Sequence, residues 1–195
     1  MKTYLLIAVA AASLMSAPAF AQTDSPFTGF RVEGHLGYDS VNIDIEEEDA
    51  DIGFDEGGLL YGLGIGYDYD FGSVVAGIEA NLDFSGVDAS MSQGTDRLKV
   101  QIDRDIEVSA RLGAKIGEQA LLYAKAGYTN AKVSGTFTSG GVSETQSDTS
   151  GGWRVGAGLE YAFGGNAFGK IEYRYSDYKF DVSRNQVLAG FGFRF

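Results

Sequence analysis

The chain lacks cysteine altogether among its 195 residues. This absence excludes disulfides, thiolate metal sites and cysteine nucleophiles. Proline is nearly absent as well, because only Pro18 and Pro26 occur and none interrupts backbone pairing after residue 26. Histidine occurs once, as His35.

Basic charge is also scarce. Fifteen Lys and Arg stand against 27 Asp and Glu, which gives a net charge of −12, and no basic stripe occurs in the sequence. Proteins bind a phosphate backbone through concentrated Lys and Arg, so nucleic acid is excluded as a partner. The abundant residues are 28 Gly, 11 Tyr and 13 Phe, which suit β-structure better than a helical bundle.

Long hydrophobic runs are missing beyond the N-terminus. Lys2 is followed by an apolar run over 4–14 and by small residues at Ala19 and Ala21, the pattern of a secretory signal with its cleavage site. The run is shorter than the ~20 residues of a spanning helix. We therefore predict a cleaved signal peptide over 1–21 and one mature domain over 22–195.

The mature sequence falls into eight segments that alternate apolar and polar residues, each close to the length of a tilted membrane-spanning strand. The segments are 30–38, 59–69, 74–84, 105–115, 122–129, 153–163, 170–176 and 187–195. Short links of turn composition (70–73, 117–119, 164–166) alternate with long ones (39–58, 85–103, 132–152 and a shorter one near 179–185). Short turns on one side and long loops on the other are typical of outer-membrane barrels.

Alternation alone fits a soluble eight-stranded barrel equally well. Two features favour a lipid-facing exterior. First, the polar face carries many glycines, and its eight basic residues balance eight acidic ones, as the interior of a narrow barrel requires. Second, aromatic residues gather toward the strand ends of the apolar face, as they do at the two interfaces of a membrane. We therefore predict an all-β fold: an eight-stranded antiparallel transmembrane up-and-down β-barrel.

The polar face predicts a charge network in the lumen. Its expected members are Arg31, Glu33, His35, Glu79, Glu107, Arg111, Lys125, Arg154, Glu160, Lys170, Glu172, Arg174 and Arg194. Asp68, Asp83, Asp105 and Lys115 occupy the same face.

The run Gly152 to Phe163, with Lys170 to Tyr175 after it, resembles the outer membrane protein β-barrel family of opacity-type antigens, hemin-binding surface antigens and porin-like small outer membrane proteins. The resemblance covers essentially the whole mature chain. It implies a surface-exposed barrel in the bacterial outer membrane, among lipid and lipopolysaccharide. The last strand resembles the signal that the barrel assembly machinery recognises, and this resemblance assigns Phe191, Phe193 and Phe195 to that role.

No catalytic, cofactor or metal site is expected. His35 could form a triad with Ser109 or Ser176, but a lumen histidine paired with Glu33 or another carboxylate explains it more simply. The acidic first link, with nine carboxylates from Asp39 to Glu56 and no base, suggests diffuse attraction of cations rather than a specific site. Hemin ligands are scarce in the links, and the Gly-, Ser- and Thr-rich link 134–152 is expected to be disordered.

The sequence thus predicts a monomeric structural protein, not an enzyme, that presents loops at the cell surface to an unknown ligand. The alternative is a narrow porin-like channel for small solutes, because lumen glycines leave space that the charged side chains must fill.

Overall fold

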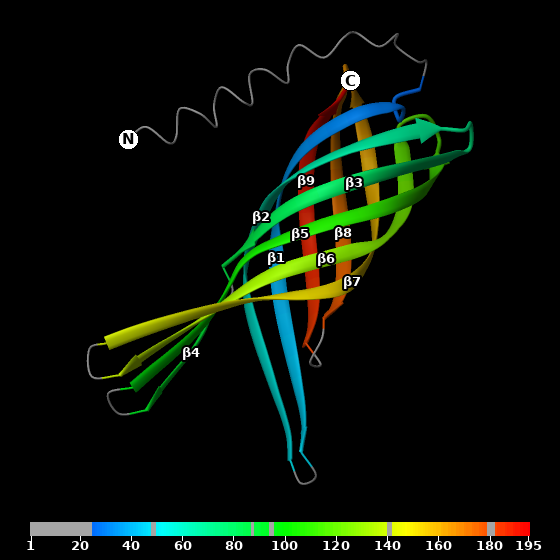
Figure 1. The fold of residues 1–195 in the computed structure, drawn as a ribbon. Helices are drawn as coiled ribbons and strands as arrows, with labels where there is room; N and C mark the ends of the chain where they lie inside the picture. The colour runs from blue at the N-terminus through cyan, green and yellow to red at the C-terminus, as the bar shows by residue number, and fades with distance from the viewer. Residues whose placement is uncertain (1–24, 48–49, 87, 94–95, 140–141, 179–181) are drawn as a thin grey trace, which may run out of the picture.

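The chain forms one continuous antiparallel β-sheet (Figure 1). The computed structural model describes residues 25–47, 50–86, 88–93, 96–139, 142–178 and 182–195. Within these ranges the strands are β1 (Gly29–Glu47), β2 (Ala50–Asp70), β3 (Val74–Ser85), β4 (Asp88–Gln93), β5 (Asp96–Ile116), β6 (Ala120–Ser139), β7 (Val142–Gly164), β8 (Ala167–Tyr178) and β9 (Val182–Arg194). The same ranges contain no helix long and apolar enough to cross a membrane.

Eight strands close the barrel. β1 pairs with β2 on one side and with β9 on the other, and β3 pairs with β5, so the ring runs β1-β2-β3-β5-β6-β7-β8-β9. The short β4 follows β3 and pairs with β5 beyond the ring. The predicted eight-stranded antiparallel barrel is therefore confirmed.

The alternation of the sequence becomes two opposite faces because successive residues of a strand point to opposite sides. Along β5, buried Asp105, Glu107 and Ser109 alternate with exposed Ile106 and Val108. This polarity is the reverse of a water-soluble barrel, in which the apolar face would be inside.

The two ends of the barrel differ. At the turn end, three short connections join β2 to β3, β5 to β6 and β7 to β8, and the N-terminal residues 25–28 and Phe195 lie there too (Figure 1). Gly117 has φ of 72° in the middle connection, a left-handed conformation that favours glycine. At the opposite, ribbon end the strands run on past the barrel as extensions.

The predicted long loops are wrong as descriptions of the backbone. β1 and β2 stay paired out to Glu47 and Ala50, and β6 and β7 stay paired out to Ser139 and Val142. The link 134–152 was expected to be disordered, but its described parts, 134–139 and 142–152, belong to this second pair of strands. Ser134 and Ser147 hydrogen-bond across it (Oγ–Oγ 3.0 Å). Its Thr residues suit strands and its register is regular, so composition alone misled the prediction.

The predicted signal peptide, residues 1–21, lies outside the described residues.

Candidate functional site

The lumen holds most of the buried charge of the protein. Within the described part of the chain, nine carboxylates, eight Lys and Arg and the one histidine are buried there. The acids are Glu33, Asp39, Asp68, Glu79, Asp83, Asp105, Glu107, Glu160 and Glu172, and the bases are Arg31, Arg111, Lys125, Arg154, Lys170, Arg174, Arg184 and Arg194. A buried charge is costly unless it is paired, and these charges form three interlocking layers.

The middle layer is centred on two lysines. Lys125 Nζ lies 2.6 Å from Glu79, 2.9 Å from Glu107 and 2.9 Å from Glu172. Lys170 Nζ lies 2.5 Å from Glu33 and 3.2 Å from Glu172. Each ammonium is thus held by more than one carboxylate, as its fully buried position requires.

The layer toward the ribbon end is built on arginines. Arg154 pairs with Asp105, with Glu107 at 3.0 Å and with Asp83 at 3.4 Å. Arg174 Nη1 lies 2.8 Å from the same Asp83 carboxylate. The outermost pair is Arg184 with Asp39, and Arg184 also reaches Asp105 at 3.0 Å.

The layer toward the turn end joins three arginines through two acids. Asp68 lies 3.1 Å from Arg31, 2.8 Å from Arg111 and 2.9 Å from Arg194. Glu160 bridges Arg111 and Arg194 at 2.9 and 2.8 Å. The Arg111 guanidinium also stacks over Tyr123, 4.8 Å from the ring centroid, which is a favourable cation–π geometry.

Glycines on the inner wall make room for this network. A Cβ on Gly62 would lie 2.5 Å from Asp83 Oδ1, 2.5 Å from His35 Nε2 and 2.6 Å from the Leu82 carbonyl. A Cβ on Gly77 would lie 2.0 Å from Asp68 Oδ1. A side chain at either position would displace an ion pair, so these glycines are needed for space.

At the turn end, beyond the charged layers, a cluster of buried apolar side chains fills the lumen, and we call this cluster the plug. Phe27, which precedes β1, is fully buried with Val75, Leu121 and Ala162. Arg194 holds the plug by donating to the Pro26 carbonyl at 2.8 Å, with its guanidinium 5.9 Å from the Phe27 ring centroid. The residues just before β1 therefore occupy the lumen at the turn end.

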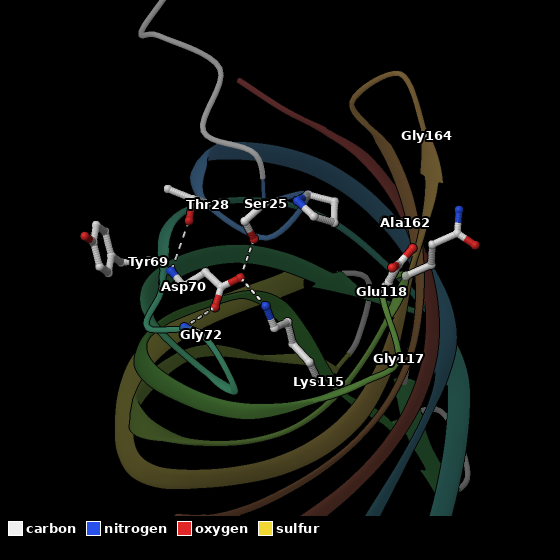
Figure 2. A pocket seen from close by; sticks show the side chains of 12 residues that line it. Ser25, Thr28, Tyr69, Asp70, Gly72, Lys115, Gly117, Glu118, Ala162 and Gly164 are labelled. Carbon is white, nitrogen blue, oxygen red and sulfur yellow. Dashed lines mark hydrogen bonds and ion pairs between the residues drawn. The ribbon is translucent and has the colours of Figure 1, made fainter.

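Beside the plug is a pocket of about 780 Å³ at the rim of the turn end (Figure 2). Asp70 accepts hydrogen bonds there from Lys115 (2.7 Å), from the Gly72 amide (2.7 Å) and from Ser25. Burial alone would raise the pKa of Asp70, but these donors outweigh it and lower that pKa below the usual aspartate range. Asp70 thus ties the N-terminal segment to the β2–β3 turn and to the end of β5.

The outer wall carries an apolar belt. Its large side chains are exposed, among them Leu36, Leu63, Ile78, Leu112 and Ile171. Aromatic groups line the belt near the turn end, where Tyr161, Phe163, Phe191 and Phe193 form a row of ring contacts with centroids 5.4–6.3 Å apart. A continuous apolar belt with aromatic borders suits a lipid environment.

The structure places all thirteen residues predicted for the charge network inside the lumen, buried. Phe191, Phe193 and Phe195 lie on the outer face. Lys115, predicted for the same face as the network, instead lies at the rim with a side chain 25% exposed and pairs with Asp70. It lies at the end of β5, beyond the last buried layer.

Sequence reasoning missed Asp39 and Arg184, which it assigned to links. Both continue the inward positions of their strands, Asp39 after His35 and Gly37, and Arg184 before Gln186 and Leu188. The alternation was visible in the sequence, but the acidic run after Asp39 and the short link before Arg184 hid it.

The structure does not assemble a catalytic triad around His35. Its Nε2 lies 2.5 Å from Asp83 Oδ1 and its Nδ1 lies 3.9 Å from Glu33. Ser176 accepts a hydrogen bond from Arg154 at 2.6 Å, and Ser109 Oγ has no hydrogen-bond partner among the described residues. Neither serine is bonded to the ring.

Residues 7–195 match the family described as the outer membrane protein beta-barrel domain. The chain belongs to this family. It is 31% identical over 182 residues to the 31 kDa outer-membrane immunogenic protein of Brucella melitensis, covering 83% of this chain and 76% of that one.

Two solved structures share the fold of this outer membrane β-barrel. Neisserial surface protein A is 17% identical with a TM-score of 0.57, over 86% of this chain and 98% of that one. The attachment invasion locus protein of Yersinia pestis is 23% identical with a TM-score of 0.53, over 86% and 99%. The family and the Brucella relative show that the protein is integral to the bacterial outer membrane. In such barrels the short turns face the periplasm and the long connections face outside the cell, so we expect the turn end in the periplasm.

Proposed function

We propose that this barrel is a non-conducting, non-enzymatic anchor that presents its two ribbons at the cell surface. The observation that carries the proposal is an ion pair across the lumen. Arg174 of β8 lies 2.8 Å from Asp83 of β3, and these strands stand four places apart in the ring of eight. Side chains of opposite walls therefore meet in the middle of the barrel.

A solute would have to separate such pairs to pass. Arg174 and Lys125 are fully buried as side chains, and each contacts more than one carboxylate. Removing one partner of a buried ion pair costs about 3 to 5 kcal/mol of stability. Several such pairs would have to separate at the same time for a solute to pass. This argues against the alternative function, a narrow channel.

Single-channel conductance of refolded residues 22–195 in a planar bilayer tests the proposal. We expect no steady openings from the wild-type protein. Arg174→Ala should admit brief openings because it removes a side chain that crosses the lumen, whereas Arg104→Ala, at an exposed position, should stay silent. Steady, discrete openings of the wild type would instead assign it the channel function.

We propose that the partner outside the cell is cationic. Beyond Asp39, which is buried and paired with Arg184, the segment 42–56 contains eight carboxylates and no base, and charge of one sign steers oppositely charged ligands. The same charge would hold divalent cations diffusely beside lipopolysaccharide. Binding of a lysine-rich peptide to whole cells, lost at high salt and lost when the ribbon acids are changed to Asn and Gln, would support this proposal.

We further propose that the protein is a monomer without cofactor, and that the barrel assembly machinery recognises Phe191, Phe193 and Phe195. The closed ring supports the monomer, because every strand of the barrel already has two neighbours and no second copy is needed to cover an edge.

A further inference from the structure

Two strands lose a barrel neighbour at a pair of glycines. Among the described residues, β2 keeps its pairing with β3 only as far as Leu60, and the glycines 57–58 follow toward the ribbon end. β7 first pairs with β8 at Gly152, so the glycines 151–152 stand at the corresponding point of the other ribbon. Glycine has the widest choice of backbone conformations, and residues of this kind often serve as hinges. We call these two glycine pairs the hinges.

A tyrosine lies over one glycine of each hinge. In the β1–β2 ribbon this is Tyr38 of β1, because a Cβ on Gly57 would lie 2.5 Å from the Tyr38 Cζ atom. In the β6–β7 ribbon it is Tyr128 of β6, because a Cβ on Gly151 would lie 2.8 Å from the Tyr128 Cζ atom. Real Cβ atoms essentially never come within 3.0 Å of another group. Each phenol ring therefore occupies the volume that a side chain on the glycine would need.

The two contacts have the same geometry. Tyr38 stands opposite Leu59, and Tyr128 stands opposite Trp153, so each ring leans over the residue two positions nearer the ribbon end of the partner strand. Both tyrosines are 60% exposed on the outer wall. β1 and β6 stand four places apart in the ring of eight. The same contact is therefore built once at the root of each ribbon, on opposite sides of the barrel.

Space, and not backbone conformation, requires a glycine under each ring. Gly57 and Gly151 are not among the described glycines that have a positive φ, so their backbone does not by itself demand glycine. A glycine inside a strand weakens the strand, and an aromatic ring placed across from it compensates for this weakness. The contact between ring and glycine therefore explains both residues together.

Both rings lie where the apolar belt of the outer wall ends. Tyr38 is followed on the outer face of its strand by Ser40, and Tyr128 is followed by Asn130. Tyrosine suits such a border because its ring is apolar and its hydroxyl is polar. Each hinge is therefore covered at the height where the ribbon leaves the membrane.

We propose that Tyr38 and Tyr128 are positioning residues that clamp the two hinges and so hold each ribbon at a fixed angle to the barrel. The inference rests on the proposed function, because a fixed angle matters only if the ribbons are presented to a partner. In Figure 1 the β1–β2 ribbon and the β4–β7 extension leave the barrel in different directions. A ring wedged against the glycine keeps these directions apart, because it blocks the bend that the glycine would otherwise allow.

The distance between two spin labels tests the first clamp, since the chain has no native cysteine. One label is attached through Asp44→Cys in the ribbon, and the other through Asp177→Cys in β8, where the strand is paired on both sides. The full mature protein is refolded into lipid bilayers, and folding is checked by the gel shift on boiling. We expect a narrow distance distribution that is lost in Tyr38→Ala and kept in Tyr38→Phe, which retains the ring.

Tyr61→Ala is the matched control. Tyr61 is also an exposed tyrosine of the outer wall, but it stacks on Phe84 with ring centroids 5.6 Å apart, so its loss should leave the distribution unchanged. Gly57→Ala should broaden the distribution, because the added methyl group displaces the ring of Tyr38. In the Tyr38→Ala background the methyl group has room, and Gly57→Ala should cause no further broadening.

Three results would overturn the clamp. A broad distribution in the protein that carries only the labels would mean that the angle is not fixed. A distribution unchanged by Tyr38→Ala would mean that the ring holds nothing. Equal broadening by Gly57→Ala with and without the Tyr38 ring would mean that the two residues do not act on each other. Conductance and peptide binding test the proposed function separately, so its failure can be distinguished from a failure of the clamp.

Discussion

At the scale of single residues, the lumen tolerates little change because each charged group serves several partners. Arg154 illustrates this: it contacts three carboxylates, Ser176 and Tyr178 while fully buried as a side chain. Losing one such residue leaves several buried carboxylates with fewer cationic partners, so the cost depends on the partners left behind.

Arg154→Ala should therefore lower the free energy of unfolding by about 3 to 5 kcal/mol. Urea titration of the refolded protein in lipid vesicles measures this change. Arg104→Ala, at an exposed position, should change it by less than about 0.5 kcal/mol. Equal effects of the two substitutions would mean that the lumen pairs contribute no net stability.

Gly62→Ala should also destabilise the barrel, by about 1 to 3 kcal/mol, because a methyl group would overpack the wall. Its Cβ would meet Asp83, His35 and a backbone carbonyl within 2.6 Å. Gly135→Ala is the control, since nothing lies within 4 Å of its Cβ position. The same urea titration should show a lower free energy of unfolding for Gly62→Ala than for Gly135→Ala. An unchanged value for Gly62→Ala would contradict the claim that this glycine is needed for space.

At the scale of elements, the barrel part of each strand was predictable from the sequence and its extension was not. Inward and outward residues differ in polarity along 30–38 or 105–115, so period-2 alternation finds those strands. The rule fails at the barrel rim, where buried, apolar Val41 follows Asp39 in the inward series and where the β5–β6 register shifts between Ile102 and Arg104. Asp39 lies at the first of these boundaries, which is why the sequence analysis assigned it to a link and not to the lumen charge network.

The N-terminal plug is an element that alternation could not predict, because Phe27 lies outside any strand. Phe27→Ala should lower the unfolding free energy by about 3 to 5 kcal/mol, the usual range for a buried Phe. Pro26→Ala, at an exposed position, should have little effect. Thermal unfolding followed by circular dichroism compares them, and similar transitions for both variants would show that the plug is dispensable.

The turn at Asp70 should make the periplasmic end sensitive to acid. Because the folded pKa of Asp70 is lowered, its stabilisation is fully present above the unfolded pKa of ~3.9 and is lost as the pH falls through the folded pKa. Wild type should exceed Asp70→Asn in stability at pH 7, and the difference should shrink below about pH 4. A difference independent of pH would rule out a role for the charge.

At the scale of the whole molecule, the barrel is closed by its two ends. The Phe195 amide donates to the Phe30 carbonyl at 2.7 Å, and the Phe30 amide donates to the Phe195 carbonyl at 3.1 Å. At this end of the seam, the contacts between Phe30 and Phe195 are made by backbone atoms, so the aromatic ring of Phe195 is not needed for them and lies on the outer face.

Because the Phe195 ring is not needed for the contacts with Phe30, Phe195→Ala can distinguish folding of the barrel from its assembly into the outer membrane of cells. After refolding in detergent it should migrate like the wild type before and after boiling, because the seam needs only backbone atoms. In cells it should reach the outer membrane in reduced amount if the machinery recognises the ring. Normal amounts in cells, measured by fractionation, would refute the assembly signal.

The glycines of the inner wall also bear on how this protein can change over generations. Because a Cβ on Gly62 would meet Asp83, His35 and the Leu82 backbone carbonyl, an inherited substitution there requires both side chains and the neighbouring strand to shift, so we expect the interior to change slowly. The two ribbons extend beyond these lumen contacts. One gene would then encode an interior that changes slowly beside extensions that change more freely.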